Sequence, residues 1–249
     1  MKGKNILKPR MYVAYARYAY IQLRKIHRDA KMSFSQEGED LLIALAFRFM
    51  KVPMPTYLDI GAHHPTRLSN TYLFYRRGSH GVCIEANPTL AKNFKKKRSR
   101  DTVLPIAIGT QMGETTLHIV SDSSLSTTSE KQAQYFDSVS KHKIIRNVKV
   151  PQKTIMDIIR TYFPIPPNLV SLDIENMDFA VLKTFDFSTC RPSLFCIETL
   201  TYDEQDGQEK LYTIIDYMKQ KNYFVFADTY VNTIFIDKEQ WPHHVPGKV

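Results

Sequence analysis

Acidic side chains and a glycine stand where two apolar segments of the chain end. Asp59 and Gly61 close the segment from Tyr57 to Ala62, and Glu85 closes the segment from Gly81 to Ala86. A glycine at such an end lets a ligand approach the backbone closely. An acid at the end of the next strand can accept hydrogen bonds from ribose hydroxyls, and a separation of about 20 residues is typical of one strand–helix–strand unit. Together these residues indicate a nucleoside-type ligand.

Phosphate-binding glycine motifs are absent from the sequence. The chain has neither a Gly-x-Gly-x-x-Gly series nor a P-loop, which counts against NAD, FAD and nucleoside triphosphates. S-adenosylmethionine (SAM) is a nucleoside joined to an amino acid through a cationic sulfonium, and it has no pyrophosphate. Its site needs the glycine and the ribose-binding acid but no phosphate loop, so the pattern predicts SAM as the cofactor.

A second group of residues could perform acid–base or metal chemistry. Asp173 and Glu175 follow an apolar segment, Glu198 ends another, and His63 and His64 come directly after the first strand. The carboxyl ends of parallel strands share one edge of a sheet, so these side chains are expected to converge. In one interpretation His63 or Asp173, with Glu175 nearby, acts as a general base. In the other, His64, Asp173 and Glu198 bind a divalent metal ion.

Alternating strand-like and helix-like segments must position these residues. The pattern predicts a doubly wound α/β fold with a mainly parallel, seven-stranded sheet of the class I methyltransferase type. The last two strands are joined by a short connection and must therefore pair as an antiparallel hairpin. The expected strands cover residues 57–62, 81–86, 103–108, 169–175, 194–198, 223–227 and 232–237.

Two further segments have a distinctive composition. Residues 121–143 are polar and rich in serine and threonine, which is typical of a lid or binding loop. The basic run from Lys92 to Arg100 follows a helix start at Asn87-Pro88. Cations at the end of a helix complement its dipole, so we expect this run to form a solvated face.

The composition is that of one globular domain. The chain has 249 residues, a net charge of +9 and cysteines at positions 83, 190 and 196 without metal-type spacing. No apolar run is long enough to span a bilayer, and the unpaired thiols suit a reducing compartment, so a cytoplasmic location is expected. The charge predicts attraction to polyanions. The expected organisation is a basic, tyrosine-rich helical arm (1–32), a catalytic domain (33–240) and a tail (241–249).

The N-terminal arm has an apolar stripe at helical spacing, formed by Tyr12, Tyr15, Ala19, Leu23 and Ile26. Three roles remain open for it. It can pack on the domain, form a homo-oligomer, or lie as an interfacial helix on a membrane surface.

Several motifs together resemble one enzyme family, the FkbM methyltransferases. The matching stretches are Ser35–Asp40, Asp59–Pro65 with Ser69–Thr71, Glu85–Pro88, Thr154–Asp157, Leu172–Glu175, Glu198 and Asn232–Ile236. The family usually has glycine after the Asp-x-Glu motif, where this chain has Asn176. Asparagine tolerates the left-handed conformation that glycine would adopt there.

The resemblance implies SAM-dependent O-methylation of a hydroxyl of a sugar or a related small molecule. The net charge of +9 would help to hold the phosphate of an acceptor that is nucleotide-linked or lipid-linked. It places Asp59, Gly61 and Ala62 at the methionine part of SAM and Glu85 with Ala86 at the ribose. It places Asn87, Ile106 and Ala107 near the adenine, and Gln36, Ser69 and Asn70 at the carboxylate.

Two alternative functions are kept beside this one. A nucleic-acid methyltransferase is disfavoured because no Asn/Asp-Pro-Pro-Tyr tetrad follows the fourth strand, where Asp173 and Glu175 stand instead. A non-catalytic binding module of the same fold is disfavoured by the presence of Gly61 and Glu85.

Overall fold

The computed structural model describes residues 13, 15, 17, 18, 20, 21, 30–201 and 208–242. The chain divides into two units, Met1–Ser33 and Phe34–Val249. In the first unit the described residues between 13 and 21 are helical, with exposed side chains. In the described parts of the chain, no helix is both long and apolar enough to cross a membrane.

A seven-stranded sheet forms the centre of the second unit, with the order β3-β2-β1-β7-β8-β10-β9. Neighbours are parallel from β3 to β8, whereas β10 runs antiparallel to both β8 and β9. The predicted mainly parallel sheet and its terminal hairpin are confirmed. The strands are β1 (Tyr57–Ile60), β2 (Gly81–Ile84), β3 (Thr102–Leu104), β7 (Leu169–Leu172), β8 (Leu194–Glu198), β9 (Tyr223–Asp228) and β10 (Asn232–Asp237).

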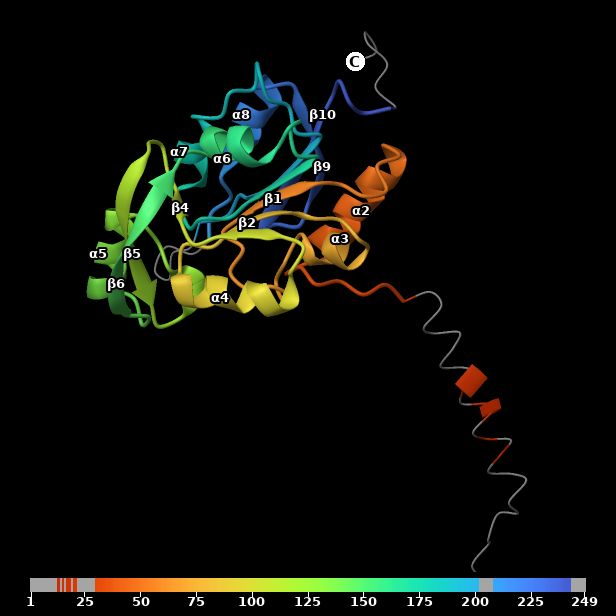
Figure 1. The fold of residues 1–249 in the computed structure, drawn as a ribbon, viewed down its shortest axis with the longest axis horizontal. Helices are drawn as coiled ribbons and strands as arrows, with labels where there is room; N and C mark the ends of the chain where they lie inside the picture. Colours follow the sequence, from red (N-terminus) through yellow and green to blue (C-terminus); the bar gives the residue numbers. More distant parts are fainter. Residues whose placement is uncertain are drawn as a thin grey trace, which may run out of the picture. The chain divides into compact units, whose positions relative to one another are not determined.

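Helices cover both faces of this sheet (Figure 1). One face carries α2 (Glu39–Phe49), α3 (Tyr72–Arg76) and α4 (Pro88–Lys97), and the other carries α6 (Ile155–Tyr162), α7 (Asp178–Leu182) and α8 (Tyr212–Gln220).

The two faces of the sheet have separate hydrophobic cores. In β1, Leu58 and Ile60 pack in the core of α6, α7 and α8, whereas Tyr57 packs with α2, α3 and α4. Because successive strand residues point to opposite faces, Asp59 lies on the side of α2, α3 and α4.

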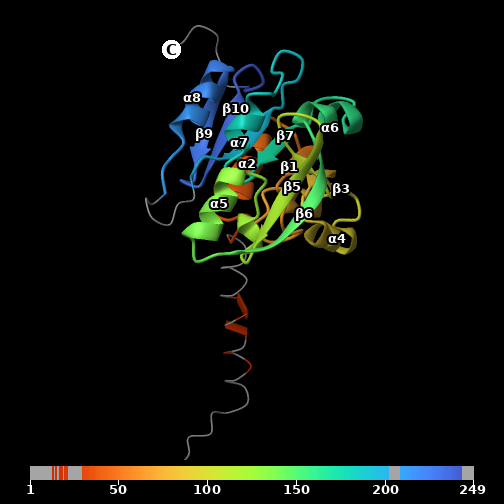
Figure 2. The ribbon, with the colours of Figure 1, turned by 90° about the vertical axis from the view of Figure 1, so that its left-hand side faces the viewer.

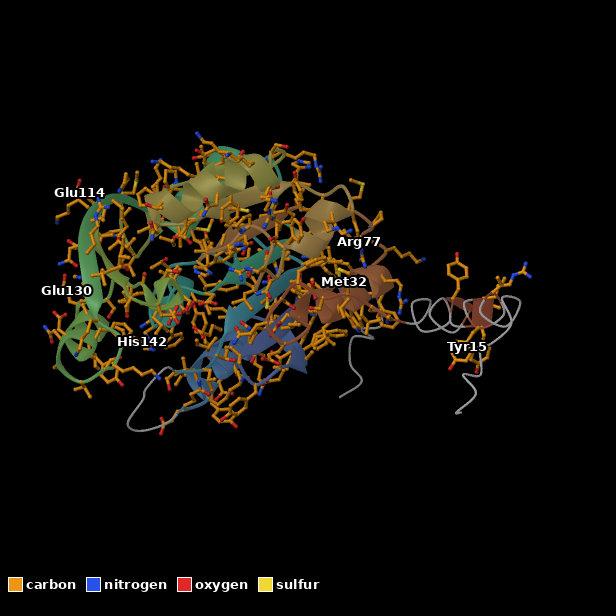
Figure 3. All side chains as sticks on the ribbon, turned by 90° about the horizontal axis from the view of Figure 1, so that it is seen from below. Tyr15, Met32, Arg77, Glu114, Glu130 and His142 are labelled. Atoms are coloured by element: carbon orange, nitrogen blue, oxygen red, sulfur yellow. The ribbon has the colours of Figure 1, made fainter. Side chains whose placement is uncertain are left out.

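A smaller three-stranded sheet is inserted in the chain between β3 and α6. It contains β4 (Ala107–Ile108), β6 (Ile144–Lys153) and β5 (Gly113–Val120), in that order. Figure 2 shows β5 and β6 beside α5 (Glu130–Ser138), and Figure 3 marks this part of the molecule with Glu114, Glu130 and His142.

Two of the expected elements differ in the structure. The predicted strand 103–108 is divided, because Pro105 has no N–H for a sheet ladder and the chain passes from β3 into β4. Residues 121–143 are not one loop but contain the short helix η1 (Ser123–Leu125) and α5. The Ser129 hydroxyl accepts a hydrogen bond from Gln132 N–H at the start of α5, and Phe136 buries the apolar face of that helix.

Candidate active site

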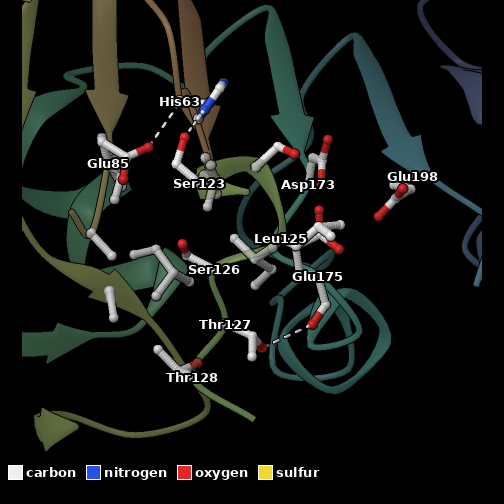
Figure 4. A pocket seen from close by; sticks show the side chains of 18 of the residues that line it. His63, Glu85, Ser123, Leu125, Ser126, Thr127, Thr128, Asp173, Glu175 and Glu198 are labelled. Carbon is white, nitrogen blue, oxygen red and sulfur yellow. Dashed lines mark hydrogen bonds between the residues drawn. The ribbon is translucent and has the colours of Figure 1, made fainter. Parts of the chain in front are cut away.

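A cavity of about 390 Å³ opens at the carboxyl ends of β1, β2, β7 and β8. Its lining includes the chain after β1, the end of β2, Asp173 beyond β7 and Glu198 at the end of β8. The segment Ser123–Thr128, between β5 and α5, forms another side. The predicted edge of the sheet is therefore where the structure has its pocket (Figure 4).

Gly61 is packed against the end of the neighbouring strand. Its φ angle is +79°, and a Cβ atom there would lie 1.6 Å from the backbone oxygen of Asp173. Asp173 N–H also donates to the Ile60 carbonyl oxygen at 3.1 Å. Any side chain at position 61 would push these strand ends apart, so glycine is required here by packing as well as by ligand approach.

Glu85 is held rigidly at one side of the cavity. One carboxylate oxygen accepts the N–H of His63 at 2.8 Å, and the other accepts the N–H of Asn87 at 2.7 Å. Burial raises the pKa of Glu85 to about 7, even though these two donors lower it. Each carboxylate oxygen has a second lone-pair site that can accept from a ligand hydroxyl.

Asp59 does not line the cavity, contrary to its predicted contact with the cofactor. Its carboxylate accepts the Thr71 hydroxyl at 2.5 Å and lies 3.7 Å from the guanidinium of Arg98. Burial raises the pKa of Asp59, and Arg98 opposes that rise. The alternation of β1 places this side chain on the face opposite to Leu58 and Ile60, where it contacts Thr71 and Arg98.

Arg98 is the centre of a buried polar network and has no exposed surface. Its Nε donates to Asp101 at 2.6 Å, and a terminal nitrogen donates to the Thr71 hydroxyl at 2.9 Å. The Tyr57 hydroxyl also donates to Asp101, at 2.7 Å. The expected solvated face is therefore wrong at this position, although Lys92, Lys95, Lys96 and Lys97 are exposed.

The other predicted cofactor residues divide into two groups. Gln36, Gly61, Glu85, Ala86, Ile106 and Ala107 line the cavity. The rest have local roles outside it. Ser69 accepts the N–H of Tyr72 at the start of α3, Asn70 donates to Ser171, Asn87 accepts the N–H of Thr89 at the start of α4, and Ala62 is buried in the core.

Three carboxylates meet in the cavity. Asp173, Glu175 and Glu198 each offer an oxygen, and these atoms lie within 4.8 Å of one another. Burial raises the pKa of Asp173 to about 6, although a hydrogen bond with Glu198 opposes the rise. Burial, reinforced by the neighbouring acids, raises the pKa of Glu175 and of Glu198 well above the ordinary value. The cluster is therefore suited to hold a proton near neutral pH.

The turn after β7 places Asp173 and Glu175 in the cavity lining. Glu175 and Asn176 have φ angles of +52° and +71°, which confirms that asparagine adopts the left-handed conformation expected for a glycine. The Asp178 carboxylate accepts the N–H of Ile174 at 3.0 Å and closes this turn.

The two histidines occupy different surroundings. His63 has a φ angle of +45° and lines the cavity, where its Nε2 is 3.1 Å from the hydroxyl oxygen of Ser123. Burial lowers the pKa of His63. His64 lies outside the lining, and its Nδ1 accepts the N–H groups of Thr66 and Arg67. The predicted metal set is thus not assembled, because Glu175 stands with Asp173 and Glu198 where His64 was expected.

Part of the lining was not predicted residue by residue. Ser123–Thr128, Leu117, Gln208 and Val231 all contact the cavity. The serine and threonine content of residues 121–143 indicated a binding loop, but no local pattern identified which six residues reach the site.

Comparison with known proteins places this site in a family. A family model described as the methyltransferase FkbM domain matches residues 59–225. The chain belongs to the FkbM methyltransferase family. The matched segment of this FkbM domain contains Gly61, Glu85, Asp173 and Glu198, which stand at the carboxyl ends of β1, β2, β7 and β8.

Solved structures similar to the FkbM domain are distant in sequence. A methyltransferase FkbM from Methylobacillus flagellatus KT has 13% identity and a TM-score of 0.44, over 74% of this chain and 44% of that chain. This chain thus spans less than half of that protein. A TehB-like SAM-dependent methyltransferase from Corynebacterium glutamicum has 11% identity and a TM-score of 0.42, over 90% and 98% of the two chains.

A third solved structure contains ligands. It is a 1,6-didemethyltoxoflavin-N1-methyltransferase from Burkholderia thailandensis with bound 1,6-didemethyltoxoflavin and S-adenosylhomocysteine. It has 11% identity and a TM-score of 0.40, over 94% of this chain and 91% of that chain. No curated protein sequence matches this chain.

Proposed function

We propose that this protein is a SAM-dependent O-methyltransferase that acts on a hydroxyl of a sugar or a related small molecule. The observation that carries the proposal is one cavity with two kinds of acid. Glu85 is fixed by backbone donors, whereas Asp173, Glu175 and Glu198 form a cluster that retains protons. The first suits a ribose, and the second suits a reacting hydroxyl.

The cofactor fits the side of the cavity at β1, β2 and β4. Glu85 would accept hydrogen bonds from the ribose hydroxyls, and Ile106 with Ala107 would contact the adenine ring. Gln36 would hold the amino-acid part. SAM supplies an electrophilic methyl group when bound.

Asp173 is the proposed general base. A sugar hydroxyl is a poor nucleophile at neutral pH, so removal of its proton assists attack on the methyl carbon. With a pKa of about 6, Asp173 is mostly ionised at pH 7 and still basic enough to accept a proton. The paired strand ends keep the methyl-donor side and the methyl-acceptor side of the cavity at a fixed separation, which favours in-line methyl transfer.

A divalent cation at the same carboxylates is the second form of this mechanism. Three oxygens within 4.8 Å of one another could hold such an ion. Assays with a chelator separate the two forms. An unchanged kcat after metal removal supports the base mechanism, whereas a loss that Mg²⁺ or Mn²⁺ restores supports the metal form.

Replacement of Glu85 is expected to weaken SAM binding. Glu85→Ala removes the ribose acceptor, so the Kd of SAM should rise about 10- to 100-fold in calorimetry. In the wild type, the Kd should rise as the pH falls below about 7, because protonation removes the ionised acceptor whose pKa is about 7. Glu114→Ala changes an exposed acid of β5 and serves as the control. A folded wild type without measurable SAM binding would refute the enzyme proposal.

His63 is expected to help position the bound acceptor rather than to act as a general base. Its ring is hydrogen-bonded to the Ser123 hydroxyl, and its backbone N–H donates to the Glu85 carboxylate. His63→Ala should therefore raise the KM of the acceptor several-fold, with little change in kcat or in the Kd of SAM. His63→Gln should restore much of the KM, since its amide can reach Ser123. A fall of kcat by about 10²-fold or more, with loss of a limb of the pH profile, would instead identify His63 as the base.

A further inference from the structure

One side of the cavity is formed by a short segment rich in hydroxyl groups. Five of the six residues in Ser123–Thr128 are serine or threonine, and all six line the cavity. We call this segment the hydroxyl wall. Figure 4 shows it beside the carboxylates of Asp173 and Glu175.

The hydroxyl wall is tied to the rest of the site at both ends. Ser123 is hydrogen-bonded to the His63 ring at 3.1 Å. The Thr127 hydroxyl donates to the Glu175 carbonyl oxygen at 3.3 Å, and its backbone pairs with His118 of β5. These contacts place the wall against the carboxylate cluster in a defined position.

Two hydroxyls of the wall retain donor capacity. The Ser126 hydroxyl accepts the N–H of Val120 at 3.3 Å, which leaves its own proton available. Among the described residues, none forms a hydrogen bond with the half-buried Thr128 hydroxyl. Both groups can therefore donate to a bound molecule and accept from it.

The charged side chains in the described lining of the cavity are acidic. Its described lining contains Glu85, Asp173, Glu175 and Glu198 but no lysine or arginine. A phosphate on an acceptor bound beside the Asp173, Glu175 and Glu198 cluster would find no cation in this described lining. Neutral hydroxyls can instead donate to the carboxylates and exchange hydrogen bonds with the wall.

We propose that the part of the acceptor that enters this cavity is an uncharged, polyhydroxylated ring, and that Ser126 and Thr128 determine its binding. This inference rests on the proposed methyltransferase function. It revises the expected phosphorylated acceptor, because a phosphate group would have to remain outside the cavity.

Paired acceptors test the charge of this group. The full chain is assayed with methyl-labelled SAM and a panel of neutral methyl glycosides, each compared with its sugar phosphate. Neutral members should be methylated with kcat/KM at least about tenfold above their phosphorylated counterparts. Equal or better transfer to the phosphates would overturn the inference. SAM binding without transfer to any neutral member also overturns it, whereas absence of SAM binding would refute the proposed function itself.

Two wall variants test the residues. Ser126→Ala and Thr128→Val should each raise the KM of a neutral acceptor about tenfold, as for loss of one hydrogen bond, with the Kd of SAM unchanged. Ser138→Ala removes an exposed hydroxyl of α5 and serves as the control. An unchanged KM in both wall variants would overturn the role of these residues.

Discussion

Replacement of Asp173 by asparagine is expected to lower kcat about 10³-fold, which is typical for loss of a general base. Asparagine keeps the shape of the side chain but cannot accept the proton of the acceptor hydroxyl. The Kd of SAM should change little, because Asp173 lies with the carboxylate cluster and not beside Glu85. Methyl transfer and SAM calorimetry on the same preparation measure both quantities.

The pH dependence gives an independent test of Asp173. Burial raises its pKa from 3.8 to about 6, so the wild-type rate should fall about tenfold per pH unit below 6 and level off above it. Asp173→Asn should lack this acid limb. Asp216→Asn, on the exposed side of α8, should keep both the rate and the limb. Full activity in Asp173→Asn would contradict the assignment.

Replacement of Arg98 by alanine is expected to lower the free energy of unfolding by about 3–5 kcal/mol, the cost of removing one partner from a buried ion pair. Asp59 and Asp101 would be left without their cation although their carboxylates are almost completely buried. The aromatic rings of Tyr57 and Phe94, which lie 5.3 and 5.7 Å from the guanidinium carbon, would lose a packing partner.

Chemical denaturation measures this loss, with two comparison variants. Arg98→Lys keeps the charge but not the planar fork, so it should be destabilised less than Arg98→Ala. Lys96→Ala removes an exposed cation from the same helix and should change the stability by at most about 0.5 kcal/mol. Equal stability of Arg98→Ala and Lys96→Ala would show that the buried network contributes nothing.

The sequence patterns predicted the sheet and the acids at its edge because both depend on local signals. Apolar runs that end in glycine or acid mark the strand ends, and Glu85, Asp173 and Glu198 follow from them. Asp59 was placed incorrectly because Leu58 and Ile60 on either side are both buried. In a strand covered on both faces, the sequence does not indicate which face a single polar residue takes.

Arg98 and the hydroxyl wall depend on contacts between distant segments. Arg98 is one of several cations at the end of α4, and its contacts with Thr71, Asp59 and Asp101 distinguish it. The wall reaches the site because it follows β5 of a separate sheet, and the strands expected from the sequence do not include β6 of that sheet. The cytoplasmic location and the role of the N-terminal arm stay predictions.

The contact between Gly61 and the Asp173 backbone has a consequence for how such enzymes diversify. The methyl donor side and the proposed base belong to β1 and β7, which pair in register from Tyr57 with Leu169 to Ile60 with Leu172. The hydroxyl wall lies in the connection between β5 and α5, outside this pair. Insertions or exchanges between β4 and β6 can therefore alter which acceptor is presented while the transfer geometry is inherited unchanged.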